Sequence, residues 1–168
     1  MPDTSTALLT LGKVADRLAI HNLLGGYAQF ASEGNLDEWS DLFADDAIFE
    51  IIIPSNAVDS PLAAGTHSFD KTRLIEMEQG LFKIYRARFL DLTLGERRLY
   101  LINNVWIVSQ SDHDAVVQAT LTLVRTAMSG PSPHIDFTGT YYGTFQKRDT
   151  GWLIYRWCLR LDRPPEAI

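Results

Sequence analysis

The sequence has little that would crosslink, export or anchor a chain. Its one cysteine, Cys158, cannot form an internal disulfide. No apolar run approaches the length of a membrane span, since IFEIII stops at Pro54. The N-terminus starts with polar residues and has no apolar signal core, and no Asn-x-Ser/Thr glycosylation site occurs. We therefore expect a cytoplasmic protein that does not contact membranes.

Positive charge is also scarce. The chain has 15 Lys and Arg against 21 Asp and Glu, for a net charge of −6 and a pI near 5.1. This balance argues against binding to nucleic-acid phosphates or anionic membranes. A local basic stretch contains Arg86, Arg88, Arg97 and Arg98. Acidic and aromatic residues interleave with these arginines, so we expect a solvated loop there.

Cofactor motifs are missing as well. The sequence contains no phosphate loop, dinucleotide fingerprint or nucleophile elbow, and no set of Cys and His ligands for an iron–sulfur cluster. The four histidines are scattered, at positions 21, 67, 113 and 134. His134 and Asp136 alternate on one predicted strand, but two ligands do not close a metal site. We therefore expect neither a metal nor a cofactor.

Periodicity predicts three helices and five strands. Apolar residues at helical spacing predict helices over about 14–32 and 69–85. Gly34 ends the first helix, and Asn35 with Glu38 predicts a capping box for a short second one. Alternation predicts strands at the AIFEIII segment and at about 97–110, 115–128, 135–147 and 151–162, with a long loop over 54–68. The order is α-α-β-α-β-β-β-β.

This order predicts an α+β fold. We expect one domain over residues 1–168, with a core from about 15 to 162. Strands of twelve or more residues twist and coil, so helices packed on the concave face of a mostly antiparallel sheet would give a cone-shaped α+β barrel.

The segment RRLYLINNVW raises the question of a pocket. Tyr100, Ile102, Asn104 and Trp106 share one face of the predicted strand by its period of two. A strand in an ordinary core would be aliphatic at these positions, whereas a pocket wall mixes apolar bulk with hydrogen-bonding groups. The mixture favours a pocket.

Three segments carry a family resemblance. YAQFASEGNLDEWSDLFADDAIFEI, RRLYLINNVWI and FTGTYYGTFQKRDTGWLIYRWCLRLD resemble the SnoaL-like branch of the nuclear transport factor 2-like superfamily. The resemblance spans about residues 15–162 and implies the cone fold. Members include dehydratases, isomerases, polyketide cyclases, epoxide hydrolases and dehydrochlorinases. Non-catalytic β subunits of aromatic-ring-hydroxylating dioxygenases also belong here, and fold alone does not choose among these.

The chain departs from the family at a catalytic pair. Several catalytic members place an Asp late in the first helix and a His on the strand, four residues before the asparagine. Counting seven residues back from Trp39 gives Ser32, and counting four back from Asn104 gives Tyr100. Neither member of the acid–base pair is therefore at its place.

The candidate catalytic residues are Tyr100, Glu33 and His134. Tyr100 would aim its phenol at a substrate oxygen, or pack with the hydroxyl at a rim. Glu33 lies at a helix end, where a carboxylate is usually solvated, and would act as a base only if buried near Tyr100. His134, at a strand start, is either structural or the best available imidazole.

The candidate substrate-binding residues are Tyr27, Asn104, Trp106, Arg125 and Tyr141. Tyr27 lies on the apolar stripe of the first helix, facing either the cavity or the core. Asn104 would bind ligand or satisfy backbone groups at a helix end. Arg125 would bind an anionic substrate or form a cross-strand ion pair, and the ion pair is favoured.

Three functional hypotheses follow. The first is a cofactor-independent lyase or isomerase, acting as a dehydratase, isomerase or cyclase on a hydrophobic, ring-containing molecule such as a polyketide, steroid, terpenoid or aromatic catabolite. The second is a non-catalytic β-subunit-like partner of a dioxygenase α subunit. The third is a ligand-binding module without turnover. We also expect a homodimer or homotrimer, because Thr120, Thr122 and Trp157 would cover the convex face of the sheet.

Overall fold

The computed structural model describes residues 11–54, 64–90, 96–127 and 133–163, with the backbone alone for 81–90, 96 and 127. These residues form three helices and six strands. In chain order the elements are α1 Leu11–Glu33, α2 Leu36–Ser40, β1 Phe43–Ile53, β2 Gly65–Asp70, α3 Lys71–Leu90, β3 Glu96–Gln110, β4 Asp114–Ala127, β5 His134–Arg148 and β6 Gly151–Leu161.

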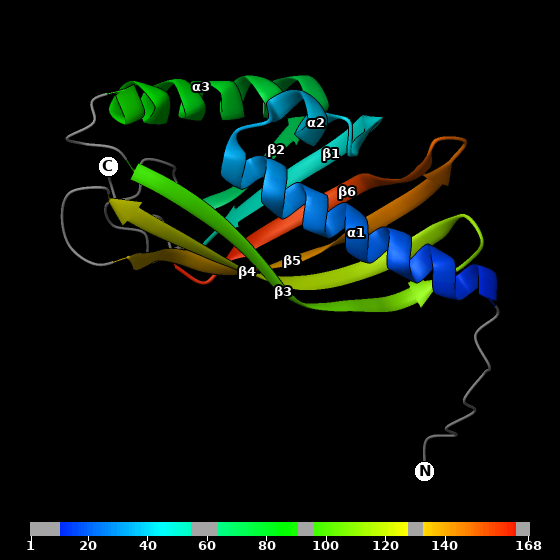
Figure 1. Ribbon diagram of the computed structural model, residues 1–168. Coiled ribbons are helices and arrows are strands. Elements are labelled where there is room, and N and C mark those ends of the chain that lie inside the picture. Colours follow the sequence, from blue (N-terminus) through cyan, green and yellow to red (C-terminus); the bar gives the residue numbers. More distant parts are fainter. Residues whose placement is uncertain (1–10, 55–63, 91–95, 128–132, 164–168) are drawn as a thin grey trace, which may run out of the picture.

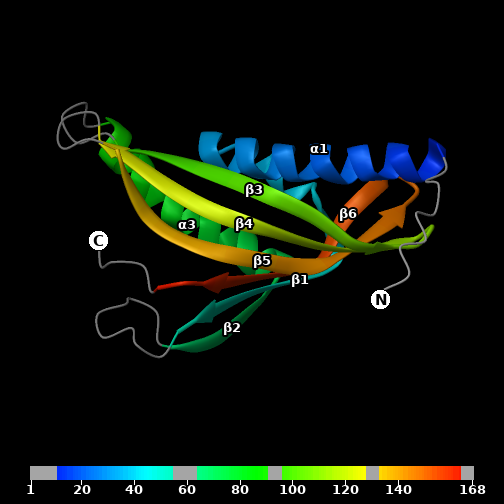
Figure 2. The ribbon, with the colours of Figure 1, turned by 90° about the horizontal axis from the view of Figure 1, so that it is seen from below.

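The strands make one mixed sheet in the order β2-β1-β6-β5-β4-β3. β1 and β6 are parallel, and every other neighbouring pair is antiparallel. Figures 1 and 2 show that the long strands curve and that α1 and α3 lie on the same, concave side. The predicted α+β fold with a curved, mostly antiparallel sheet is confirmed, although the sheet is open rather than closed into a barrel.

Strand β2 was not predicted, so the predicted order lacks one strand. Gly65–Ser68 lies in the expected loop, and Phe69 and Asp70 lie in the expected third helix, which starts at Lys71 instead. The strand pairs with β1 from Ile53↔Gly65 to Ile48↔Asp70. Its side chains are mostly exposed, so it carries little apolar alternation for a sequence pattern to reveal. Asp70 Oδ1 accepts a hydrogen bond from the Arg73 backbone N–H at 2.8 Å and so caps the start of α3.

In the turn after α1, the prediction for Gly34 is confirmed and the prediction for Asn35 is not. Gly34 has a φ of 78° and its N–H donates to the Phe30 carbonyl, as expected for a glycine that ends a helix. The capping box is wrong. Asn35 occupies the N-cap of α2, but its side chain donates to Glu33 Oε2 at 3.1 Å, away from the helix N–H groups.

The core on the concave side is built around Trp157. Its ring stacks on Tyr141 at 4.8 Å between centroids and also contacts Phe145. Gly143 lies between these two aromatic residues on β5 and pairs with Trp157, where it leaves room for the indole. Trp157 is therefore buried inside, and our expectation that it covers the convex face is wrong.

Helix α1 is fixed across the sheet by a polar contact near its start. Asp16 accepts hydrogen bonds from Lys147 Nζ at 2.7 Å and from Trp152 Nε1 at 3.0 Å. These donors lie at the turn between β5 and β6, while further along α1 contacts β3. The helix therefore runs over the concave face from the turn between the central strands β5 and β6 to the edge strand β3 (Figure 1).

Candidate functional site

Three tyrosines from three elements approach one another on the concave side. Tyr27 of α1 and Tyr141 of β5 are 3% and 1% exposed, and their hydroxyl oxygens lie 3.2 Å apart. Tyr100 of β3 is half-buried against the same core and interacts electrostatically with both. We refer to Tyr27, Tyr100 and Tyr141 as the tyrosine cluster.

Burial determines the protonation of these phenols. It raises the pKa of Tyr27, Tyr100 and Tyr141 above the ordinary value near 10, because a phenolate would lose its hydration. All three therefore keep their protons at neutral pH. A protonated phenol donates one hydrogen bond, so the cluster supplies donors for a carbonyl or hydroxyl oxygen.

A carboxyl group of α3 faces this cluster. Glu78 is half-buried, and it interacts electrostatically with Tyr27, Tyr100 and Tyr141. Burial raises the pKa of Glu78 to about 7, and the nearby Arg98 guanidinium opposes part of this rise. A carboxyl group with such a pKa can both take and give a proton near neutral pH.

Arginines border the cluster at the beginning of β3. Arg98 hydrogen-bonds to the Tyr100 phenol and lies 3.8 Å from the Asp136 carboxylate. Asp136, which is 4% exposed, pairs more closely with Arg125 at 2.7 Å. The predicted cross-strand ion pair of Arg125 is thereby confirmed. Arg163 donates to the Asp136 backbone carbonyl at 3.0 Å and closes the group.

The two positions that the family resemblance singled out are in contact here. Ser32 Oγ accepts a hydrogen bond from the Tyr100 backbone N–H at 2.9 Å and donates to the Ala28 carbonyl at 2.7 Å. β3 is an edge strand of the sheet, so this serine satisfies an N–H that has no neighbouring strand. The two positions at which the family resemblance implies an acid–base pair are therefore joined in this chain by a hydrogen bond from the Tyr100 backbone to the Ser32 side chain.

The predicted shared face of Tyr100, Asn104 and Trp106 is wrong. Asn103 pairs with Thr120, but Trp106 pairs with Gln118, so β3 carries one extra residue between them. Asn104 has a φ of 51° at this bulge, a conformation that asparagine tolerates better than most residues. The extra residue reverses the faces that follow it.

As a result, Asn104 and Trp106 point away from the tyrosine cluster. Asn104 is exposed and donates to Thr120 Oγ1 at 3.2 Å on the convex side, and Trp106 is 60% exposed. Ile107 takes the inward position instead. Of the residues expected along this strand face, Tyr100 and Ile102 remain packed against the core.

The structure does not bring Glu33 or His134 to the cluster. Glu33 is exposed at the end of α1 and accepts hydrogen bonds from Gln29 and Asn35. It therefore lacks the burial near Tyr100 on which its role as a base depended. His134 is exposed at the first position of β5.

Sequence reasoning missed Glu78, Arg98 and Asp136. Arg98 was assigned to a solvated loop, but it lies in β3 with its side chain only 16% exposed, whereas the neighbouring Arg97 is exposed. The side chains of Arg86 and Arg88 lie outside the described residues. One signal for Glu78 was present, since it follows Leu74 by one turn and so interrupts the apolar stripe of α3 with a carboxyl group.

Two buried indole N–H groups flank the tyrosine pair. The Trp39 ring lies 5.5 Å from Tyr27, and that of Trp157 stacks on Tyr141. Within the described ranges, neither Nε1 atom has a hydrogen-bond partner. An unsatisfied buried donor costs free energy, so a ligand oxygen that reached either one would be stabilised.

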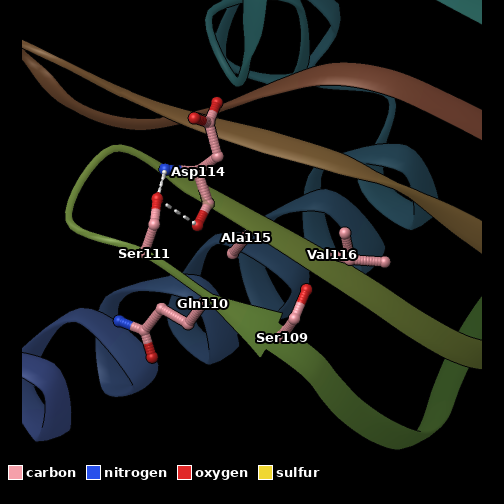
Figure 3. A pocket seen from close by; sticks show the side chains of 6 residues that line it. All are labelled: Ser109, Gln110, Ser111, Asp114, Ala115 and Val116. Atoms are coloured by element: carbon pink, nitrogen blue, oxygen red, sulfur yellow. Dashed lines mark hydrogen bonds between the residues drawn. The ribbon is translucent and has the colours of Figure 1, made fainter.

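A shallow pocket lies elsewhere, at the hairpin between β3 and β4 (Figure 3). Its lining residues are Ser109, Gln110, Ser111, Asp114, Ala115 and Val116. It is open to solvent, and the Ser111 hydroxyl is already bonded to the Asp114 backbone. Its chemistry is that of a hairpin turn, so we place the candidate site at the tyrosine cluster.

The described residues provide neither a metal site nor a membrane-spanning helix. Among the residues that the structure describes, no group of three or more His, Cys, Asp or Glu side chains could hold a metal ion. The described helices include none with the length and apolar character that crossing a bilayer requires.

Solved structures with the same fold include a protein from Novosphingobium aromaticivorans described as the β subunit of an aromatic-ring-hydroxylating dioxygenase. It is 21% identical, with 94% of this chain and 95% of that chain covered and a TM-score of 0.70. Another, from the same organism, is described as a scytalone dehydratase, at 18% identity, 95% and 97% coverage and a TM-score of 0.67. A third is an NTF2-like protein with a cystatin-like fold, also from that organism, at 16% identity, 93% and 92% coverage and a TM-score of 0.66.

At identities below 25%, these TM-scores show a shared fold and no more. No curated protein matches the sequence. The model of the SnoaL-like domain matches residues 12–158, which include every helix and strand almost in full. The chain belongs to the family of SnoaL-like domains, within the nuclear transport factor 2-like superfamily.

Proposed function

We propose that this protein is a cofactor-independent enzyme of the dehydratase, isomerase or cyclase type. Its substrate would be a hydrophobic molecule with rings, such as a polyketide, steroid, terpenoid or aromatic catabolite. The observation that carries the proposal is the buried Tyr27–Tyr141 hydroxyl pair, with Tyr100 beside it on the concave side of the sheet.

The cluster suits reactions in which charge develops on oxygen. Removing a proton next to a carbonyl places negative charge on the carbonyl oxygen, and a preorganised donor in a dry site stabilises that charge. The surrounding aromatic side chains of Trp39, Phe43 and Trp157 would pack against rings. The scytalone dehydratase-like neighbour supports dehydration as the first reaction to test.

The test uses a bicyclic β-hydroxy ketone of the tetralone type, whose dehydration gives water and a naphthol that absorbs in the near ultraviolet. We expect the wild-type protein to accelerate this reaction. Tyr100→Phe removes one hydroxyl and keeps the ring, so turnover should fall roughly tenfold to a thousandfold with little loss of stability. Tyr142→Phe is the matched control, because Tyr142 is 54% exposed and lies next to Tyr141 in sequence.

The outcome separates the proposal from its alternatives. Equal turnover in wild-type protein and Tyr100→Phe would remove that phenol from the mechanism. No acceleration of any ring ketone by the wild-type protein, combined with tight binding of a naphthol to the tyrosine cluster, would favour a ligand-binding module without turnover.

A second candidate function is a non-catalytic subunit. Three large apolar side chains on the convex side, Leu101, Trp106 and Tyr142, are 43%, 60% and 54% exposed. A partner surface would cover them, and the dioxygenase β-subunit-like neighbour suggests an iron-containing α subunit as that partner. Co-purification with such an α subunit, together with no effect of Tyr100→Phe on the assembled activity, would favour this reading.

A further inference from the structure

We propose that Glu78 is the proton-transferring group of this site, acting on a cyclic ketone that carries a hydroxyl on the β-carbon. This inference rests on the proposed function and adds to it the general base. Neither the family resemblance nor the residue pattern assigned a role to this glutamate.

The position of Glu78 on α3 carries the inference. Leu74, one turn earlier, is almost fully buried, and Met77 packs against the core, so this side of the helix faces the sheet. Glu78 shares that side and is half-buried, whereas Glu76 is exposed to solvent. α3 contacts both β1 and β3, and the carboxyl group is within electrostatic range of tyrosines on α1, β3 and β5.

The groups that face Glu78 suit it to exchange protons at neutral pH. Those with which it interacts are Arg98 and Tyr100 from β3, Tyr27 from α1 and Tyr141 from β5. The tyrosines are neutral, and Arg98 is also paired with Asp136. Burial therefore dominates and places the pKa of Glu78 at about 7, so both protonation states are populated near neutral pH.

Three other titratable groups, Asp136, Glu33 and His134, are less suited to this work. Asp136 is buried but bonded to Arg125 at 2.7 Å and close to Arg98. Glu33 and His134 are exposed away from the tyrosines. Glu78 combines burial, proximity to the phenols and a position opposite the sheet.

The reaction balances with this one carboxyl group. Its carboxylate takes a proton from the carbon beside the ketone, the C–H electron pair forms a C=C bond, and the carbonyl π electrons move to oxygen. The Tyr100 hydroxyl, hydrogen-bonded to Arg98, donates to that oxygen. When the carbonyl re-forms, the C=C pair shifts toward the β-carbon, the C–O bond to the hydroxyl breaks, and Glu78 returns its proton to the leaving hydroxide. Water and an enone result, and Glu78 is a carboxylate again; with the tetralone-type substrate the enone tautomerises to the naphthol.

Deuterium exchange tests the first half of this step without the second. Unsubstituted tetralone has the ketone and the neighbouring C–H bonds but no β-hydroxyl, so in D₂O its α-protons exchange when a base removes them. We expect Glu78→Gln to lower the exchange rate and the dehydration rate at least a hundredfold. Glu76→Gln, on the same helix and exposed, should keep both rates. Thermal unfolding monitors the fold of each variant.

A titration provides a readout besides activity. In protein labelled with ¹³C at the glutamate carboxyl, the signal that is absent from Glu78→Gln should titrate near pH 7, against about 4.5 for an ordinary glutamate. Retention of the wild-type exchange rate by Glu78→Gln, or titration of its signal at the ordinary value, would overturn the assignment of Glu78 while leaving the proposed function intact. A wild-type protein that neither exchanges nor dehydrates these ketones would instead overturn the proposed function itself.

Discussion

The close packing of β5 on β6 makes a quantitative prediction at Gly143. A Cβ atom built on this glycine would lie 2.0 Å from the Arg156 carbonyl oxygen and 2.6 Å from Cε3 of Trp157. Real Cβ atoms essentially never come within 3.0 Å of such atoms, so β6 would have to move away by about 1 Å. The carbonyl belongs to the backbone of a paired strand and cannot rotate aside. Gly143→Ala therefore forces the two central strands apart and disturbs the stacking of Trp157 on Tyr141.

Overpacking a core usually costs about 1–3 kcal/mol, and a backbone clash belongs at the upper end. For a chain of this size each kcal/mol lowers the melting temperature by about 2–4 °C, so Gly143→Ala should melt about 6–12 °C below wild type. Differential scanning calorimetry measures the shift, and near-ultraviolet circular dichroism reports the altered packing of the aromatic rings.

Gly25→Ala is the matched control for this substitution. Gly25 is exposed in α1, and its Cβ would meet nothing within 4 Å. Alanine in a helix interior is favoured over glycine by about 0.5–1 kcal/mol, so this variant should melt slightly higher than wild type. A Gly143→Ala protein that melts within 1 °C of wild type, under conditions in which Gly25→Ala raises the melting temperature, would refute the packing described for β5 and β6.

Three further predictions concern charge and assembly. The donors on Asp16 lower its pKa below 3.8, so the stabilisation is present above that pH and is lost as the pH falls through the lower, folded-state pKa. Asp16→Asn should cost about 1 kcal/mol at pH 7, discounted for the exposure of Lys147, and the difference from wild type in urea melts should shrink as the pH falls below 3.8. Asp136→Asn breaks a buried pair with Arg125 and should destabilise by about 3–5 kcal/mol in the same assay, a figure that a loss under 1 kcal/mol would contradict. Wild-type protein should be a dimer or trimer by light scattering at micromolar concentration, and Trp106→Ser should weaken the assembly at least roughly tenfold; a wild-type monomer would disprove the expectation.

Much of the fold could be predicted because its long elements repeat their pattern many times. Over α1 the buried apolar stripe runs from Ile20 to Ala31, which is about three turns. β4 and β5 alternate buried and half-buried residues along most of their length. An error at one position leaves such a pattern recognisable. Strand β2 has six residues with mostly exposed side chains, and it forms by pairing with β1. This pairing depends on a neighbouring strand and leaves no periodic pattern in the sequence of β2 itself.

The candidate site was harder to predict, because its geometry depends on one residue of β3. Period-two reasoning correctly turned Tyr100 and Ile102 toward the core, but it carried the same face through to Trp106. The bulge at Asn104 reverses the faces to which the following side chains point. The positive φ of Asn104 is a property of the backbone that sequence alternation cannot reveal.

Glu78 shows why an acid–base group can be overlooked when a pattern is expected elsewhere. The family resemblance directed attention to Ser32 and Tyr100, where this chain has a structural hydrogen bond in place of a pair of titrating groups. A carboxyl group on the inward side of α3 is costly to bury, since the charged form loses its hydration. Nothing in the packing of Leu74 or Met77 requires that carboxyl group, and an apolar side chain would be more stable at the same position. A carboxyl group that lowers stability at its position, and whose pKa lies near neutral beside three hydrogen-bond-donating phenols, is better explained by the reaction of the site than by the fold.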